Sequence, residues 1–379
     1  ASAYSPSKDP QQSQRAAQYG ARQASSTPRA QPLIPLEFVT VEAINKMIFE
    51  SDVNGPARVH KLLSRFVEEN RDALQSPNYN NPQKDDLSYM ASALHHVTFL
   101  ESRPLLLAVV RALKICVRKS VNRNNLQAME IVPVTDLLGQ FGVAGSGPDV
   151  EIATDVANFV LNVCYCVRNV THVLGCVPHL VECLKSDQEC LQIAAAGALQ
   201  SICMYEEGKD RVISCVGVAG VLALLHSQNL KVVERCIGTL HNVSTVWAGV
   251  HSIRDNEGLA LVVALLEETY PPEVKRHAAG VLQNCSRDKD SVGIIREHNA
   301  IPLLSNLLFM DDLTTQMPAT GALLNLNGIC GDQSEERQAM KSTLGQCIAI
   351  GLLSGMMEEC MAAVESDKAG PGGGQAPKR

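Results

Sequence analysis

The sequence predicts an all-α protein made of stacked helical repeats, and three observations support this. First, one motif recurs around four glycines, which are Gly197, Gly238, Gly280 and Gly321. Their numbers differ by 41, 42 and 41, and a fixed period near forty residues is typical of an α-solenoid. Second, each copy follows a shorter apolar motif that lies shortly upstream. Third, the chain is 45% hydrophobic but only 4% aromatic, a composition that suits closely packed helices.

Residues 1–36 predict an extended N-terminal arm rather than a folded unit. They are rich in Ser, Gln, Pro and Ala, and their acid-poor sequence cannot bury enough apolar surface to fold alone. A solvated tail and an arm that becomes ordered on a partner are both open interpretations. We favour the partner-docking arm, with Arg15, Arg22 and Arg29 as its contact residues.

Residues 37–130 predict atypical repeats that cap the start of the array. Apolar spacing indicates helices over 37–51, 57–74, 86–99 and 103–117. In the first of these, the expected core residues are Phe38, Val41, Ile44 and Ile48. Asn, Gly and Pro at 54–56, and the Pro- and Asn-rich stretch 76–82, predict the connecting turn and loop.

Residues 131–364 predict the regular repeats, and residues 365–379 a flexible C-terminal tail. A second-helix motif is expected at 133–141, followed by an enlarged loop over 142–149. In the upstream motifs, Pro178 and Pro302 fall near helix starts, where the missing N–H of proline costs nothing. Residues 335–353 are expected to add two helices that close the far end.

The paired motifs resemble the armadillo repeat. Examples are Ala-Ile-Pro-Leu-Leu-Ser-Asn-Leu-Leu at 300–308 and His-Ala-Ala-Gly-Val-Leu-Gln-Asn at 277–284, and the resemblance spans residues 131–353. It implies three helices per repeat, stacked into a right-handed superhelix whose third helices line a concave groove. The expected fold is therefore an all-α, armadillo-like solenoid with extended N- and C-terminal tails.

A ladder of polar residues follows the motif glycines at a spacing of one helical turn. Its members are Asn162, Ser201, Asn242, Asn284 and Asn325. In armadillo proteins this asparagine lines the groove, and an amide can donate to and accept from a peptide main chain. The other interpretation is that these amides only tie neighbouring repeats together.

The tryptophans of the importin-alpha branch are missing. That branch carries Trp one turn before the ladder asparagine, where this chain has Gly197, Gly238, Gly280, Gly321 and Asn158. This departure argues against recognition of nuclear-import cargo. The glycines are more similar to scaffolding armadillo proteins of the vacuolar or plant type.

A mildly basic patch is expected in the middle of the groove. Arg235, Arg276 and His277 lie one turn before the motif glycines, and His241 lies beside the ladder. By resemblance to catenin-like members, this patch would bind an acidic extended segment. Glu234 and Glu273 nearby support the alternative of a solvated helix start with mixed charge.

The sequence gives no indication of catalysis, a metal site or a cofactor. It contains no phosphate-binding glycine loop with a strand and helix around it, and no Cys/His spacing for a tetrahedral metal site. The net charge of −7 argues against nucleic-acid binding, and no apolar run is long enough to span a membrane. The 13 cysteines, including Cys164, Cys203 and Cys236, are interpreted as reduced core residues.

These observations predict a non-catalytic protein–protein interaction scaffold, most simply a structural subunit of a larger assembly. The alternative is an exchangeable adaptor that holds an extended peptide in the groove. The chain starts at Ala1, and its Arg- and Ser-rich start resembles the segment directly after a mitochondrial presequence. We therefore expect a mitochondrial location, as a peripheral subunit of an energy-converting complex that is associated with the membrane only through partners. The cytoplasm is the alternative location.

Overall fold

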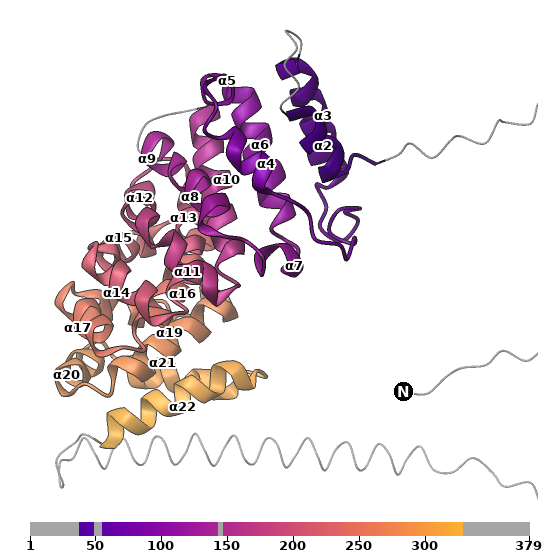
Figure 1. Cartoon of the computed structure of the whole chain (residues 1–379). Coiled ribbons are helices and arrows are strands. Elements are labelled where there is room, and N and C mark those ends of the chain that lie inside the picture. The colour runs from indigo at the N-terminus through magenta and orange to yellow at the C-terminus, as the bar shows by residue number, and fades with distance from the viewer. Residues whose placement is uncertain (1–37, 49–54, 143–146, 329–379) are drawn as a thin grey trace, which may run out of the picture. The chain divides into compact units, whose positions relative to one another are not determined.

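The computed structural model describes residues 38–48, 55–142 and 147–328, and the described residues from Val39 onward belong to one compact unit. Within these ranges the secondary structure is helical throughout (Figure 1). None of the described helices combines the length and apolar character needed to cross a membrane. The expected arm, the closing helices at 335–353 and the C-terminal tail lie outside the described residues.

The N-terminal part contains eight helices in the described ranges. They are α2 (Val41–Ile48), α3 (Gly55–Glu69), α4 (Ser88–Ala93), α5 (Val97–Glu101), α6 (Arg103–Cys116), α7 (Ser120–Arg123), α8 (Ala128–Thr135) and α9 (Leu137–Phe141). Val41, Ile44 and Ile48 are buried as expected. Phe38 was expected in the core, but it precedes the helix and its side chain is 59% exposed.

Three further helix limits expected in this part are wrong, and local hydrogen bonds explain each difference. The single helix over 86–99 is two helices, because the N–H groups of Leu94, His95 and His96 bond three residues back and His96 is extended. Helix α3 ends before Asn70, whose side-chain oxygen accepts from Ser76 and from the backbone N–H of Asn78, at 2.7 and 2.8 Å.

The third difference concerns Pro133, which was expected to begin a second helix. It lies inside α8, which starts earlier because Gln127 and Glu130 form a capping box. The backbone N–H of Gln127 donates to the Glu130 carboxylate at 2.6 Å. The expected second helix at 133–141 is therefore divided between α8 and α9.

The regular part repeats a three-helix unit. Its third helices are α10 (Pro148–Val163), α13 (Glu189–Ile202), α16 (Leu230–Val243), α19 (Pro272–Cys285) and α22 (Leu313–Gly328). The first helices are α11 (Val167–Val173), α14 (Glu206–Ser214), α17 (Trp247–Asp255) and α20 (Lys289–Glu297). The second helices are α12 (Val177–Cys183), α15 (Gly217–Ala223), α18 (Gly258–Ala264) and α21 (Ala300–Asn306), with 3₁₀ turns η1 (Leu174–Cys176), η2 (Leu224–His226) and η3 (Leu307–Phe309) beside them.

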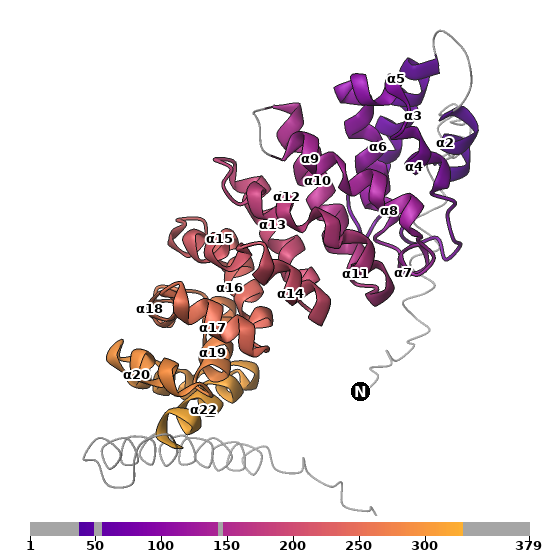
Figure 2. The ribbon, with the colours of Figure 1, turned by 60° about the vertical axis from the view of Figure 1, so that its left-hand side comes forward.

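The third helices pack against one another in chain order and form one row, which we call the third-helix row. The row continues into the N-terminal part, because α3 packs on α6 and α6 packs on α10. Figure 2 shows α10, α13, α16 and α19 one after another, with α9, α12, α15 and α18 along one edge. The atypical and regular parts therefore share one continuous row of helices.

Buried apolar side chains hold the helices of this row together. Leu240 and Leu282, which follow the motif glycines, are fully buried, as is the run of small residues Ala195–Ala198 on α13. Small side chains allow neighbouring helices to approach closely. The small residues and sparse aromatic residues of this chain therefore suit tight stacking of the third helices.

Candidate functional site

The ladder asparagines use their amide N–H groups to bond the preceding repeat. Asn242 Nδ2 donates to the carbonyl oxygen of Gln200 at 2.9 Å, and Asn284 Nδ2 donates to Ser244 Oγ at 3.0 Å. Asn325 Nδ2 donates to the carbonyl oxygen of Gln283 and to Ser286 Oγ, both at 3.1 Å. These three amides therefore tie repeats together, and their carbonyl oxygens are the atoms left to accept from a partner.

The other two ladder residues behave differently. Ser201 is only 7% exposed, so its hydroxyl is largely withdrawn from the surface. Asn162 is half-buried and lines a pocket of about 420 Å³ together with Tyr79, Tyr165 and Arg123. The start of the ladder therefore opens onto a pocket, whereas Ser201 is closed.

The motif glycines leave room for a side chain of the preceding repeat. A Cβ added at Gly238 would lie 2.2 Å from Gln200 Nε2, and one at Gly321 would lie 2.3 Å from Gln283 Nε2. At Gly280 the neighbour is the ring of His241, with Nε2 at 2.4 Å. The space that a tryptophan would need is therefore occupied by the residue that precedes the ladder position in the previous repeat.

His241 and His277 form a pair that bridges α16 and α19. Their Nδ1 atoms are 3.1 Å apart, so one ring donates to the other when both are neutral. Burial lowers the pKa of both rings, and Arg276 lowers it further; for His277 the pKa falls to about 4. The pair is therefore uncharged near pH 7.

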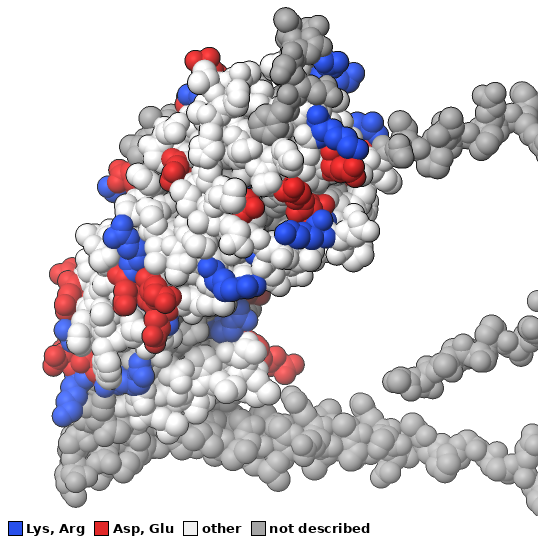
Figure 3. Space-filling model, in the orientation of Figure 1, with Lys and Arg blue, Asp and Glu red and all other residues white. Residues whose placement is uncertain are grey.

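The structure brings the four predicted basic and histidine residues together, and Arg235, His241 and His277 bond within the protein. Arg235 Nη1 donates to Gln200 Oε1 at 3.2 Å, and Arg276 acts on both histidine rings electrostatically. Glu234 pairs with Lys231 at 2.9 Å. Figure 3 shows Lys and Arg side chains interspersed with Asp and Glu on the face that it draws.

Helix α6, near the N-terminal end of the third-helix row, carries charged residues at two positions. One corresponds to the motif glycine of the regular repeats, and the other corresponds to the residue just before the ladder position. Counted from the capping residue of each third helix, Arg111 stands where α13 has Gly197, and Lys114 stands where α13 has Gln200. Arg111 bonds Glu151 at 2.5 Å and Asp155 at 2.9 Å, and Lys114 also bonds Asp155. The α6–α10 contact is thus ionic, whereas the later contacts between third helices contain no ion pair among the described residues.

These charged residues were missed by sequence reasoning. Apolar spacing predicts the helix over 103–117, but it does not give the register of that helix relative to the motif glycines. A count from the capping residue places Arg111 and Lys114 on the face that bears the ladder, and it would have found them.

A line of exposed apolar side chains follows the turns that end the third helices. Tyr165 and Met204 each come directly after the residue that caps a third helix, and Trp247 begins α17, three residues after the cap of α16. Their side chains are 59%, 55% and 54% exposed, and we call these three residues the turn stripe. The Arg123 guanidinium lies 5.6 Å from the Tyr165 ring centre, and that of Arg287 lies 5.2 Å from the Trp247 ring centre. Exposed aromatic and arginine side chains of this kind are enriched at protein interfaces.

The cysteines offer no reactive thiol at these positions. Cys164, Cys203, Cys236 and Cys285 are free and buried, and burial raises the pKa of each thiol to about 12. Over the described ranges, His, Cys, Asp and Glu do not gather in any group of three that could hold a metal ion. The predicted docking residues Arg15, Arg22 and Arg29 lie outside the described residues.

Comparison with known proteins agrees with this architecture of a helical-repeat solenoid. The family model for the armadillo/beta-catenin-like repeat matches residues 173–204 and 288–326. A designed armadillo repeat protein, YIII(Dq)4CqI, is similar with a TM-score of 0.55 and 17% identity over 64% of this chain and 100% of its own. The chain therefore contains armadillo/beta-catenin-like repeats and has the fold of an armadillo solenoid.

Two further solved structures have the same fold. An engineered protein, structural genomics target OR497, is similar with a TM-score of 0.57 and 17% identity over 80% of this chain and 82% of its own. A designed armadillo repeat protein in complex with the peptide (KR)4 has a TM-score of 0.54 and 17% identity over 64% of this chain and 100% of its own. No curated protein matches the sequence.

Proposed function

We propose that this chain is a non-catalytic protein-interaction scaffold that holds an extended segment of a partner protein along the third-helix row. The turn stripe is the observation that carries the proposal. Tyr165, Met204 and Trp247 expose large apolar side chains within three residues of the caps of successive third helices. Burying such side chains against a partner is favourable, at about 25 cal/mol per Å² of apolar surface.

The ladder supports the same proposal. The amide N–H groups of Asn242, Asn284 and Asn325 are bonded within the protein, which fixes the orientation of their carbonyl oxygens. Fixed acceptors cost little side-chain entropy when a peptide N–H binds to them. A designed protein of this fold binds the peptide (KR)4, which gives the fold a precedent for peptide binding.

The experiment is native purification of the tagged protein from its own cells, followed by re-binding of the identified partner to variants. Met204→Glu and Trp247→Glu place a carboxylate in the turn stripe, and both sites are exposed, so the fold should be retained. Phe309→Glu is the matched control, because Phe309 is 48% exposed but lies after a second helix. We expect the stripe variants to weaken binding about tenfold or more and the control to bind normally. Equal binding by all three would contradict the proposal.

The scaffold is proposed in two forms, a permanent structural subunit and an exchangeable adaptor. The first form includes the proposal of a peripheral subunit of a mitochondrial energy-converting complex, which rests on the sequence alone. Sizing of the natively purified protein distinguishes the forms. Stoichiometric recovery in one large complex would support the subunit, and a mostly free chain would support the adaptor.

A further inference from the structure

Arg118 has an unusual position at the N-terminal end of the third-helix row. It follows the residue that caps α6, in the same register as Tyr165 on α10 and Arg287 on α19. Its guanidinium is half-buried and donates to the carbonyl oxygens of Asn70 and Arg71, at 3.1 and 3.4 Å. Among the described residues, no carboxylate lies within ion-pair distance of Arg118.

A half-buried cation without a carboxylate partner is costly. Burial lowers the pKa of Arg118, although the more distant Asp155 and Asp72 act in the opposite direction. Asp155 is already bonded to Arg111 and Lys114. The positive charge of Arg118 is therefore only partly compensated, and an anion placed beside it would bind favourably.

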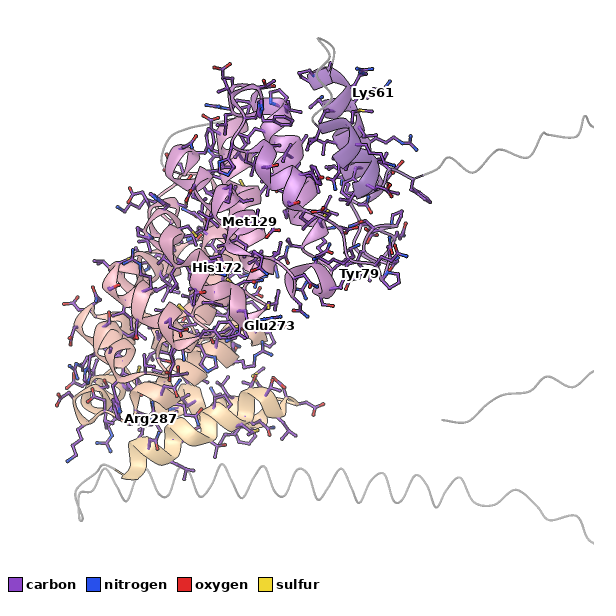
Figure 4. All side chains as sticks on the ribbon, in the orientation of Figure 1. Lys61, Tyr79, Met129, His172, Glu273 and Arg287 are labelled. Carbon is purple, nitrogen blue, oxygen red and sulfur yellow. The ribbon has the colours of Figure 1, made fainter. Side chains whose placement is uncertain are left out.

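Two adjoining pockets give an anion access to this guanidinium. The first, of about 350 Å³, lies between α3 and α6 and is lined by Arg71, Arg118 and Ile115 among others. The second, of about 420 Å³, is lined by Arg118, Arg123, Tyr79, Tyr165, Asn162 and Ala73. Figure 4 shows Tyr79 near α7, far from Arg287 at the other end of the row.

Three arginines that line these pockets form no ion pair with a described carboxylate. Arg71 is exposed at the mouth of the first pocket. Arg123 donates to the carbonyl oxygens of Val117 and Arg118, at 3.0 and 2.5 Å, and lies over the Tyr165 ring. The acidic lining residue is Glu68, which is exposed. Arg71, Arg118 and Arg123 therefore give the pockets a positive excess.

We propose that these two pockets are an anchor for an acidic side chain of the extended partner segment. A partner Asp or Glu carboxylate pairs with Arg118, and Arg71 and Arg123 lie on either side. Tyr79 and Tyr165 contact the flanking residues, and Asn162 accepts from or donates to the main chain. This inference rests on the proposed function. It adds that the partner segment is acidic and that it is fixed at the N-terminal end of the third-helix row.

An acidic protein segment fits the pockets better than a nucleic acid does. The chain has a net charge of −7, and Glu68, Asp72 and Asp155 surround the arginines. Continuous phosphate backbones need a broad positive surface, whereas a single carboxylate needs one well-placed guanidinium. The arrangement around Arg118 supplies one such guanidinium and no broad positive surface.

The test measures binding of three fluorescently labelled peptides by anisotropy at low and high salt. They are an alternating Asp/Glu peptide, (KR)4, and a neutral Gly/Ser peptide of equal length. We expect the acidic peptide to bind most tightly and to weaken at high salt, because the contact is electrostatic. Arg118→Gln should weaken its binding about tenfold or more, the usual loss for a charge-assisted hydrogen bond.

Two further variants keep the result interpretable. Arg71→Gln removes an exposed charge at the pocket without removing a hydrogen bond to the fold, and we expect about threefold weaker binding. Lys61→Gln is the control, because Lys61 is an exposed cation of α3 that lines neither pocket, and it should leave binding within about twofold of wild type. Thermal melting would verify that each variant is folded.

The anchor is overturned if the acidic peptide does not bind, or if it binds Arg118→Gln and Arg71→Gln as tightly as wild type. Failure here is distinct from failure of the proposed function. If the natural partner still requires Met204 and Trp247, the scaffold stands and only the acidic anchor is wrong.

Discussion

The atypical N-terminal repeats and the regular repeats share one row of third helices but join their neighbours by different chemistry. In the regular part, Gly238 and Gly280 accept a neighbouring Gln200 or His241 side chain, and asparagine amides bond across the repeat boundary. In the atypical part, Arg111 stands at the glycine position and pairs with Glu151 and Asp155.

The same positions of the third helices therefore have different roles in the regular part and in the atypical part. Glycine and asparagine close the contact between repeats, so little space is left beside Ser201. In the atypical part, the charged residues Arg111 and Lys114 line a pocket between α3 and α6, and Arg118 lines both this pocket and the second one. The irregular end is therefore where a partner can be anchored, and the regular part supplies a uniform face.

The largest expected effect concerns the buried leucines that both parts contain. Leu282 and Leu113 are almost completely buried, one in each part. Leu282→Ala and Leu113→Ala should each lower the free energy of unfolding by about 2–5 kcal/mol, measured by urea denaturation. A loss below about 0.5 kcal/mol for either would contradict the assignment of that helix to the core.

The next effect tests whether the glycine position is filled in the regular part. Gly280→Ala should cost about 1–3 kcal/mol, because the new Cβ meets the His241 ring, and this outweighs the better helix propensity of Ala. In a His241→Ala background the same substitution should be neutral or stabilising. An unchanged cost in the double variant would show that the ring does not occupy this space.

The histidine pair of the regular part predicts that stability depends on pH. The folded-state pKa of His277 is about 4, below its ordinary value of 6.5. The unfolded chain therefore binds the proton more readily, so this contribution is complete above about pH 6.5 and is lost as the pH falls towards 4. Between pH 7 and 5 the loss should be about 1–2 kcal/mol, after allowance for partial exposure of the ring.

Four neighbouring side chains also affect the pKa of His277. His241, Arg276 and Arg235 oppose its protonation, and Glu234 favours it. Chemical denaturation of wild type and His277→Gln between pH 5 and 7 is the measurement. The variant should lose much of the slope, whereas equal slopes would assign the pH dependence to other groups.

The smallest effect concerns backbone strain, which occurs at non-glycine residues of the regular part. Val216, Glu257 and Asn299 precede successive second helices and have φ of 59°, 58° and 59°. A β-branched residue is poorly suited to this left-handed conformation, and Asn tolerates it better. Val216→Asn should raise the stability by about 0.5–1 kcal/mol. A lower melting temperature would contradict this.

The sequence predicts the regular fold well because the period is strict. The glycines and leucines recur every 41 or 42 residues, and Leu240 and Leu282 are buried where expected. The helix limits near 94–96 and at Pro133 could not be predicted, because a turn at His96 and a capping box at Gln127 override the apolar spacing. Such local hydrogen bonds leave little trace in periodicity.

The candidate site is predicted only in part. The sequence places Asn242, Asn284 and Asn325 on one face, but it cannot say that their amide donors are already bonded across repeats. It also cannot show that Arg118 lacks a carboxylate partner among the described residues, because Asn70 and Arg71, which approach it, are far away in the chain. Contacts between distant segments decide both points.

The most direct test of the central claim is site-specific photo-crosslinking to the co-purified partner. A benzophenone amino acid would replace Met204, in the turn stripe, or Phe309, after a second helix; both side chains are exposed. If the partner lies along the third-helix row, it should crosslink from position 204 and not from position 309. Crosslinking from position 309 alone would place the partner elsewhere and contradict the account.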